Sequence, residues 1–269
     1  DTSIGSSELL KLEYRFEGQD VQHLKKGTSE AEKVTVSFFM KTNKAFTFMC
    51  ELDDADNNRV NVQQFTTSTS FTRHIITFDG DTTGALDDDV NRSLAVAIYL
   101  HAGSDFTGGT YSANTWQSRA SSDNMRAVGI GSFYDSTDND VKITGLQVEV
   151  GAVATPFEHR SFAEDQELCK RYYTQSNPGS AIATGDLSFG PAPSPLTVSY
   201  TTEMRAAPTV QTKTDVDTGS GRYTVVGAGN FTNGDFIQSL THRFNMRVPD
   251  ALSDTSRRCS CGFVADAEI

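Results

Sequence analysis

Alternation of apolar and polar residues is the main pattern in the first part of the chain. Two segments carry apolar residues at every second position. These residues are Val34, Val36, Phe38 and Met40 in the first segment and Leu94, Val96, Ile98 and Leu100 in the second. Because successive side chains of a strand point to opposite faces, both segments are predicted to be strands with these residues facing a core.

Shorter apolar runs, separated by clusters of Gly, Asn, Asp and Ser, indicate further strands. They are Arg73–Phe78, Val141–Ile143, Leu146–Val150, Tyr223–Val226 and Phe244–Val248. At Gly145 the apolar register shifts by one residue, which predicts a bulge or a bend within one strand. Many short strands with turn signals and little helix signal favour an all-β, antiparallel β-sandwich.

One helix is predicted after the first part of the chain. Ser161 and Glu164 have the spacing of a capping box and open a helix that we expect to reach about Tyr173. Apolar residues four apart are expected to pack against a neighbouring element. They are Leu168, Cys169, Tyr172 and Tyr173.

A segment rich in proline and glycine follows the helix up to Pro195, and it is predicted to be a linker. The expected organisation is therefore a β-sandwich over 1–160, a helix and linker over 161–195, and a smaller β domain over 196–269. In the last domain one strand face is predicted to consist of His242, Phe244, Met246 and Val248.

The net charge narrows the range of partners. The 269 residues include 35 Asp and Glu against 23 Lys and Arg, which gives −12. An acidic surface repels phosphate and anionic lipid, so we expect no nucleic-acid partner. We also expect no membrane insertion, because no apolar run approaches the roughly 18 residues of a membrane span. The basic pairs Lys25-Lys26 and Arg257-Arg258 are predicted to be solvated. Since the first residue is Asp1, we expect a trimmed product or a fragment.

Four cysteines are too few for a disulfide scaffold in a chain of this length. They are Cys50, Cys169, Cys259 and Cys261. Buried free thiols are the favoured interpretation, with a disulfide and a metal cluster as alternatives. The metal cluster is disfavoured because the sequence has no set of four ligands at the spacing of a metal site.

Acidic turns raise the alternative of bound calcium. The segment 54–58, with Asp54, Asp56 and Asn57, offers oxygen atoms as an EF-hand loop does, but Arg59 stands where that loop needs glycine. The segments 87–89 and 135–140 are similar. The favoured interpretation is local capping of turns by Asp and Asn side chains, and no metal site is predicted.

Catalytic motifs are not found. The five histidines lie in unrelated sequence contexts, and no Ser or Cys lies in a nucleophile elbow. We therefore predict no catalytic residues and no cofactor. A carboxylate pair at glycosidase spacing stays an open alternative.

Two aromatic residues are the candidates for ligand binding. Trp116, the only tryptophan, lies with Tyr111 in a polar, glycine-containing stretch. Exposed near each other, these rings could stack on sugar; the alternative, which is the favoured interpretation for Trp116, is that it closes one end of a core.

Several segments resemble a known group of proteins. The opening segments 17–24 and 34–44 are similar to the start of a jelly-roll module that recurs in virion proteins of tailed phages. The closing segments are similar to the end of the same module. They are Ile143-Thr144-Gly145-Leu146-Gln147-Val148-Glu149-Val150-Gly151, Ala154-Thr155-Pro156-Phe157-Glu158-His159-Arg160 and Cys169-Lys170-Arg171-Tyr172-Tyr173. The resemblance covers about residues 10–175. The segments 204–208 and 265–269 look like the C-terminal companion domain of those proteins.

The resemblance implies an antiparallel jelly roll similar to carbohydrate-binding ones, in a non-catalytic virion protein assembled in the host cytoplasm. A tail-fibre or appendage module that contacts the host surface is favoured. Alternatives are a capsid decoration or fibre protein and a carbohydrate-binding module or carbohydrate-active enzyme. Expected partners are other virion proteins, copies of the same chain as a trimer, and a host surface glycan. Because related proteins usually have a longer N-terminal part, we expect a preceding segment that attaches to the particle.

Overall fold

The computed structural model describes residues 3–175, 185–187, 196–212, 223–225, 229–231, 235–247, 257–260 and 263–268. The chain forms two compact units, Asp1–His159 (unit 1) and Arg160–Glu268 (unit 2). Each unit is described by itself.

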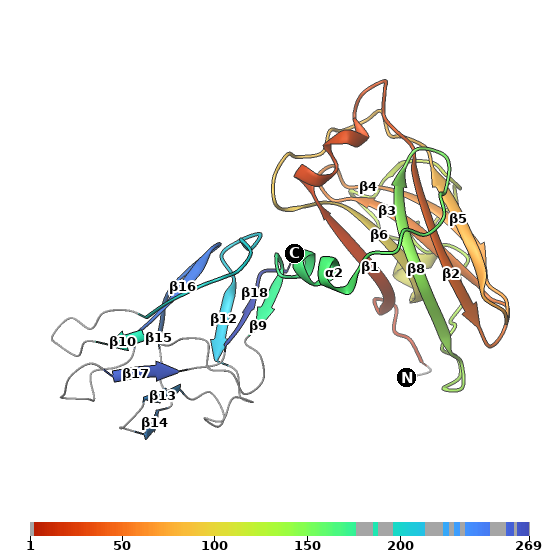
Figure 1. Ribbon diagram of the computed structural model, residues 1–269. Helices are drawn as coiled ribbons and strands as arrows, with labels where there is room; N and C mark the ends of the chain where they lie inside the picture. The colour runs from red at the N-terminus through yellow and green to blue at the C-terminus, as the bar shows by residue number, and fades with distance from the viewer. Residues whose placement is uncertain are drawn as a thin grey trace. The chain divides into compact units, whose positions relative to one another are not determined.

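Unit 1 consists of two antiparallel sheets in separate layers (Figure 1). The five-stranded sheet has the order β1 (Leu9–Glu17), β6 (Arg92–Ala102), β3 (Thr47–Asp54), β4 (Arg59–Thr66) and β7 (Gln117–Ser118). The three-stranded sheet has the order β5 (Thr72–Phe78), β2 (Val34–Thr42) and β8 (Val141–Val150). Three short helices complete it, η1 (Gly18–Asp20), η2 (Gln22–Leu24) and α1 (Ser104–Thr107). The predicted all-β class is confirmed, whereas the jelly-roll connectivity stays a prediction.

The core of unit 1 lies between the two sheets. All eight alternating apolar residues of β2 and β6 that were predicted to face inward are buried and belong to one cluster. Phe48, Cys50 and Leu52 of β3 join it, as do Ile76 and Phe78 of β5. The predicted register of these strands is therefore confirmed.

A bulge in β8 occurs where the apolar register shifts. Ser37 of β2 pairs with Gln147, but Phe39 pairs with Thr144, so two residues of β8 lie opposite one residue of β2. Gly145 is one of them and has φ of +61°, in the left-handed region that glycine adopts without steric cost. The predicted bulge is confirmed.

The outer face of the five-stranded sheet is also covered. A second apolar cluster combines residues of the sheet with residues of the long segment between β6 and β8. Its buried members are Met49, Val62, Ala97, Tyr99, Ala102, Ala127 and Ile130. The five-stranded sheet is therefore buried on both faces around its central strands.

Unit 2 begins with α2 (Phe162–Cys169). The predicted capping box is confirmed, because the Glu164 N–H donates to Ser161 Oγ and the Ser161 N–H donates to Glu164 Oε2. The helix ends four residues before the predicted end. The Tyr172 N–H bonds to the Cys169 carbonyl as in a turn, and Tyr173 begins β9 (Tyr173–Gln175).

The packing predicted for the helix is wrong for three of its four residues. Leu168, Cys169 and Tyr173 are exposed, and Tyr172 is half-buried. The segment from Glu164 to Glu167 is polar, and strand pairing with Asp266 fixes Tyr173. Capping and strand pairing, rather than an apolar face, determine this part of the chain.

Among its described residues, unit 2 has three small antiparallel sheets. One has the order β12 (Thr209–Thr212), β18 (Phe263–Asp266) and β9, and another β11 (Leu196–Ser199), β16 (Arg243–Arg247) and β15 (Asp235–Leu240). The third has the order β10 (Gly185–Leu187), β17 (Arg257–Ser260), β13 (Tyr223–Val225) and β14 (Gly229–Phe231). Val198, Met204, Phe263, Ala265 and Ala267 are buried.

The predicted strands of the second domain correspond to β13 and β16. His242 lies in the turn before β16, not in the strand, and Val248 lies outside the described residues. The strands β9 and β10 both lie within 161–195, the segment that the sequence predicted as helix and linker.

Candidate functional site

The two aromatic candidates do not share a surface. Trp116 packs against the core between the sheets, and its Nε1–H donates to the Asp79 carbonyl at 2.7 Å. Tyr111 packs against the second cluster, and its hydroxyl accepts from the Gln64 N–H at 3.0 Å. Both rings are half-buried. The arrangement fits the alternative in which Trp116 closes part of a core, while a role in ligand binding stays a prediction.

The outer face of the five-stranded sheet holds an ion cluster that the sequence analysis missed. It consists of Glu51 and Asp53 on β3 together with Arg92, Arg119 and Arg126. Alternation in β3 places Glu51 and Asp53 on the face opposite Cys50 and Leu52. Their partners on β6 are Ala97 and Ala95, whose small side chains leave room above the sheet for arginine side chains.

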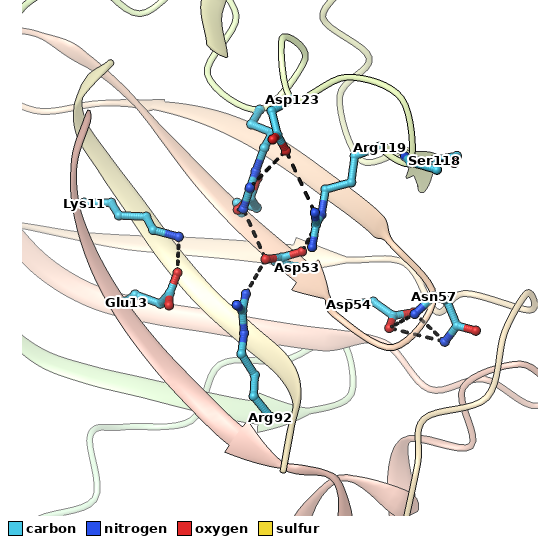
Figure 2. Close-up of polar contacts among 12 residues, drawn as sticks. Lys11, Glu13, Asp53, Asp54, Asn57, Arg92, Ser118, Arg119 and Asp123 are labelled. Atoms are coloured by element: carbon cyan, nitrogen blue, oxygen red, sulfur yellow. Dashed lines mark hydrogen bonds and ion pairs between the residues drawn. The ribbon is translucent and has the colours of Figure 1, made fainter. Parts of the chain in front are cut away.

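Each carboxylate of the ion cluster is bound by arginine. Arg126 donates to both oxygens of Glu51, at 2.6 and 2.8 Å, and to Asp53 at 3.1 Å. Arg119 Nε donates to Asp53 at 2.9 Å, and Arg92 reaches the same carboxylate from the other side (Figure 2). The Tyr99 hydroxyl donates to Glu51 at 3.1 Å.

Burial governs the electrostatics of this cluster. Glu51 is fully buried, which raises the pKa of its carboxyl, and the Arg126 guanidinium opposes that rise. Burial alone would lower the pKa of Arg126, but the hydrogen bonds to Glu51 hold it above its usual range. Arg119 and Arg126 both belong to the segment 119–126 and donate to carboxylates of β3, so the cluster attaches this segment to the sheet.

A second buried charge lies at Lys26. Its Nζ is 2.5 Å from Asp54, 3.0 Å from Asp81, 2.8 Å from the Thr83 carbonyl and 2.9 Å from the Gly84 carbonyl. The Trp116 ring centroid is 5.2 Å from Nζ. We call this arrangement the Lys26 cage. The prediction that this lysine is solvated is wrong, because tertiary contacts surround it with oxygen atoms.

The Lys26 cage bears on the calcium alternative at 54–58. The Asp54 carboxylate contacts the Lys26 ammonium and accepts from the Asn57 N–H at 3.0 Å. Arg59 Nε contacts Asp81 at 2.6 Å. Burial would raise the pKa of Asp81, but hydrogen bonds from Arg59 and Lys26 lower it. In the part of the chain that the structure describes, no group of three or more His, Cys, Asp or Glu side chains is placed to hold a metal.

The motif that carries the resemblance binds its own backbone. The Gln147 and Glu149 side chains of β8 accept from the N–H groups of Glu158 and Thr155, at 2.8 and 3.1 Å. In unit 2, Arg205 Nε donates to the Ala267 carbonyl at 2.9 Å, which joins the two segments of the companion-domain motif. These motif contacts hold segments of each unit together.

An open cavity of about 640 Å³ lies at one end of unit 1. The N-terminus and the loop before β8 lie at this end (Figure 1). We call it the end cavity. Its lining residues come from the N-terminal segment, β1, β6 and the loop before β8: Ser3, Ile4, Glu8, Leu9, Leu10, His101, Tyr134, Ser136, Thr137 and Asn139.

A bulge in β6 brings His101 to the end cavity. Lys11 pairs with Tyr99 but Leu10 pairs with His101, so Leu100 is an extra residue of β6. The alternating pattern of 94–100 contains no signal for this bulge. In the sequence His101 is only an isolated histidine, because Ser132 and Tyr134, which contact it, lie about thirty residues away.

Comparison of the sequence with protein-family models and with curated proteins finds no match.

Among the described residues, no helix is both long and apolar enough to cross a bilayer.

Proposed function

We propose that the chain is a non-catalytic structural protein of a phage particle, a tail-fibre or appendage module that contacts the host surface. One observation carries the proposal. The motif that is similar to phage virion proteins is held by hydrogen bonds between its own residues, among them Gln147, Glu149 and Thr155, as expected for a motif with an architectural role.

The chemistry of unit 1 also supports binding over catalysis. The close carboxylates Glu51 and Asp53 are held by arginine, whereas the open end cavity is lined mainly by neutral groups. A general acid or base needs an atom that can reach substrate, and the oxygen atoms of Glu51 are occupied.

Exposed apolar residues on two end strands support assembly into a homo-oligomer, for which we favour a trimer. β1 and β8 each end their sheet, and they carry exposed apolar side chains. These are Leu12, Tyr14, Leu146 and Val150. A second copy would cover them and pair the free edges.

Location in the particle is tested by electron microscopy with an antibody raised against the chain. We expect label on tail appendages, and recombinant chain should reduce adsorption of the phage to its host. Label on the shell would instead favour a capsid decoration protein. A particle without label would contradict the virion proposal.

Assembly is tested by light scattering of Leu12→Glu beside Ile75→Glu. Both replace exposed apolar residues, but Ile75 lies on β5, away from β1 and β8. We expect an oligomer for the natural chain and for Ile75→Glu, and dissociation of Leu12→Glu. A natural chain that is monomeric at all concentrations would overturn the oligomer.

A further inference from the structure

We propose that the end cavity binds a neutral saccharide unit. The inference deepens the proposed function, because it names the ligand class and the surface through which the host would be contacted. Its volume of about 640 Å³ falls within the roughly 300–1,000 Å³ of small-molecule sites.

The lining matches a ligand that has hydroxyl groups and apolar faces. Ser136 and Thr137 offer hydroxyls, while Ile4, Leu9 and Leu10 offer apolar surface. The lining contains no lysine or arginine and includes one carboxylate, that of Glu8, which would disfavour acidic sugars. A neutral saccharide satisfies both kinds of surface without leaving a buried charge unpaired.

His101 supplies a polar group at fixed orientation. Its Nδ1 lies 2.8 Å from Ser132 Oγ, and its side chain is mostly buried. Burial lowers the pKa of His101, which favours the neutral form of the imidazole. A neutral imidazole has one donor and one acceptor nitrogen. With one nitrogen bonded to Ser132, the other is suited to a sugar hydroxyl, which can donate or accept.

Tyr134 supplies a supported aromatic ring. It packs edge-on against Phe133, with centroids 5.2 Å apart, and against His101 at 6.3 Å. Phe133 is fully buried, so it anchors Tyr134 at the rim of the core. Aromatic rings fixed in this way present a flat apolar surface to the C–H face of a sugar.

The loop that carries Tyr134 is itself braced. Asn139 Nδ2 donates to the Phe133 carbonyl at 2.5 Å and to Asp135 at 2.7 Å. Lys44 pairs with Asp135 at 2.9 Å. The site is thus preorganised, which reduces the entropic cost of binding.

The test is binding of the full chain to an array of neutral, acidic and amino-sugar oligosaccharides, followed by calorimetry with the neutral oligosaccharide that binds best. Thr137→Trp places a bulky group on the cavity wall at an exposed position. Asp138→Trp is the matched control, because Asp138 is exposed on the same loop and does not line the cavity.

We expect Thr137→Trp to weaken binding at least tenfold with an unchanged Tm, and Asp138→Trp to bind as the natural chain does. Equal binding by both variants would overturn the site. Binding of acidic sugars alone, or of none of the oligosaccharides, would overturn the ligand class. Adsorption blocked equally by the natural chain and Thr137→Trp would leave host contact standing while the end cavity fails.

Discussion

At the scale of single residues, the Lys26 cage places one ammonium between two carboxylates and two carbonyls. Removing one partner of a buried ion pair leaves the other charge uncompensated, which costs about 3–5 kcal/mol. We expect Lys26→Met to lower the free energy of unfolding by this amount. Lys25→Met is the control, because Lys25 is exposed and its ion pairs are worth about 0–1 kcal/mol. Urea denaturation measures the free energy of unfolding of both variants, and equal losses of stability in the two would contradict the prediction.

Glu13 on β1 gives a pH-dependent contribution to stability. Burial alone would raise the pKa of Glu13, but hydrogen bonds from Lys11 and Arg15 lower it from 4.5 to about 2. A carboxyl whose pKa is lower in the folded state stabilises the fold above 4.5 and loses this effect as pH falls through about 2. We expect Glu13→Gln to be less stable than the natural chain at neutral pH.

The difference in Tm between Glu13→Gln and the natural chain should then narrow as pH falls from 4.5 towards 2. Thermal melts across that range measure it. A difference that stays constant with pH would show that the ionised form of Glu13 gains nothing from folding.

Two cysteines differ in their exposure. Cys50 is fully buried, and burial raises the pKa of its thiol, whereas Cys169 at the end of α2 is exposed. Because the thiolate is the reactive form, iodoacetamide should label Cys169 in the folded chain and Cys50 only after unfolding. Peptide mass spectrometry reads both sites, and early labelling of Cys50 would contradict its burial. The prediction of buried thiols therefore holds for Cys50 and is wrong for Cys169.

At the scale of elements, the bulge in β8 depends on Gly145. A side chain there would sit at φ of +61° with its Cβ 3.3 Å from the Phe39 ring. We expect Gly145→Ala to lower the free energy of unfolding by about 1–2 kcal/mol, the energetic penalty of a non-glycine residue in the left-handed conformation. Gly131→Ala is the control, because Gly131 does not have a positive φ and a Cβ there would make only an ordinary contact of 3.6 Å with Phe46. Chemical denaturation measures the free energy of unfolding of both variants, and similar losses of stability in the two would refute a special role for Gly145.

Local patterns predicted the elements whose signal lies within a few residues. The alternation in β2 and β6 reported a buried face, the shift at Gly145 reported a bulge, and Ser161 with Glu164 reported a capped helix start. Each of these features depends on contacts between neighbours in sequence or on a single buried face, so the local sequence is sufficient to predict it.

Features built from distant segments could not be predicted in the same way. Glu51 and Asp53 look like a solvated face of β3, because Arg126, which covers them, lies 75 and 73 residues away. Lys26 meets Asp54 and Asp81 only in the folded chain. The end of α2 was missed because Tyr173 pairs with Asp266 near the other end of the sequence.

At the scale of the whole molecule, the single tryptophan reports on unit 1 alone. Trp116 packs against the core of unit 1, which has its own two sheets and two apolar clusters. We expect a fragment of residues 1–159 to fold, and its urea midpoint by tryptophan fluorescence to match that of the full chain. A fragment that is unfolded, or a clearly lower midpoint, would show that unit 1 depends on unit 2.

The positive charge of the Lys26 cage is covalently attached to the chain. A bound ion can be removed by chelators or lost on dilution, and its occupancy follows the ion content of the medium. A tethered ammonium has a fixed stoichiometry in every copy as soon as the chain folds. The contribution of this cage to the stability of unit 1 is therefore independent of the supply of any dissociable cation in the medium.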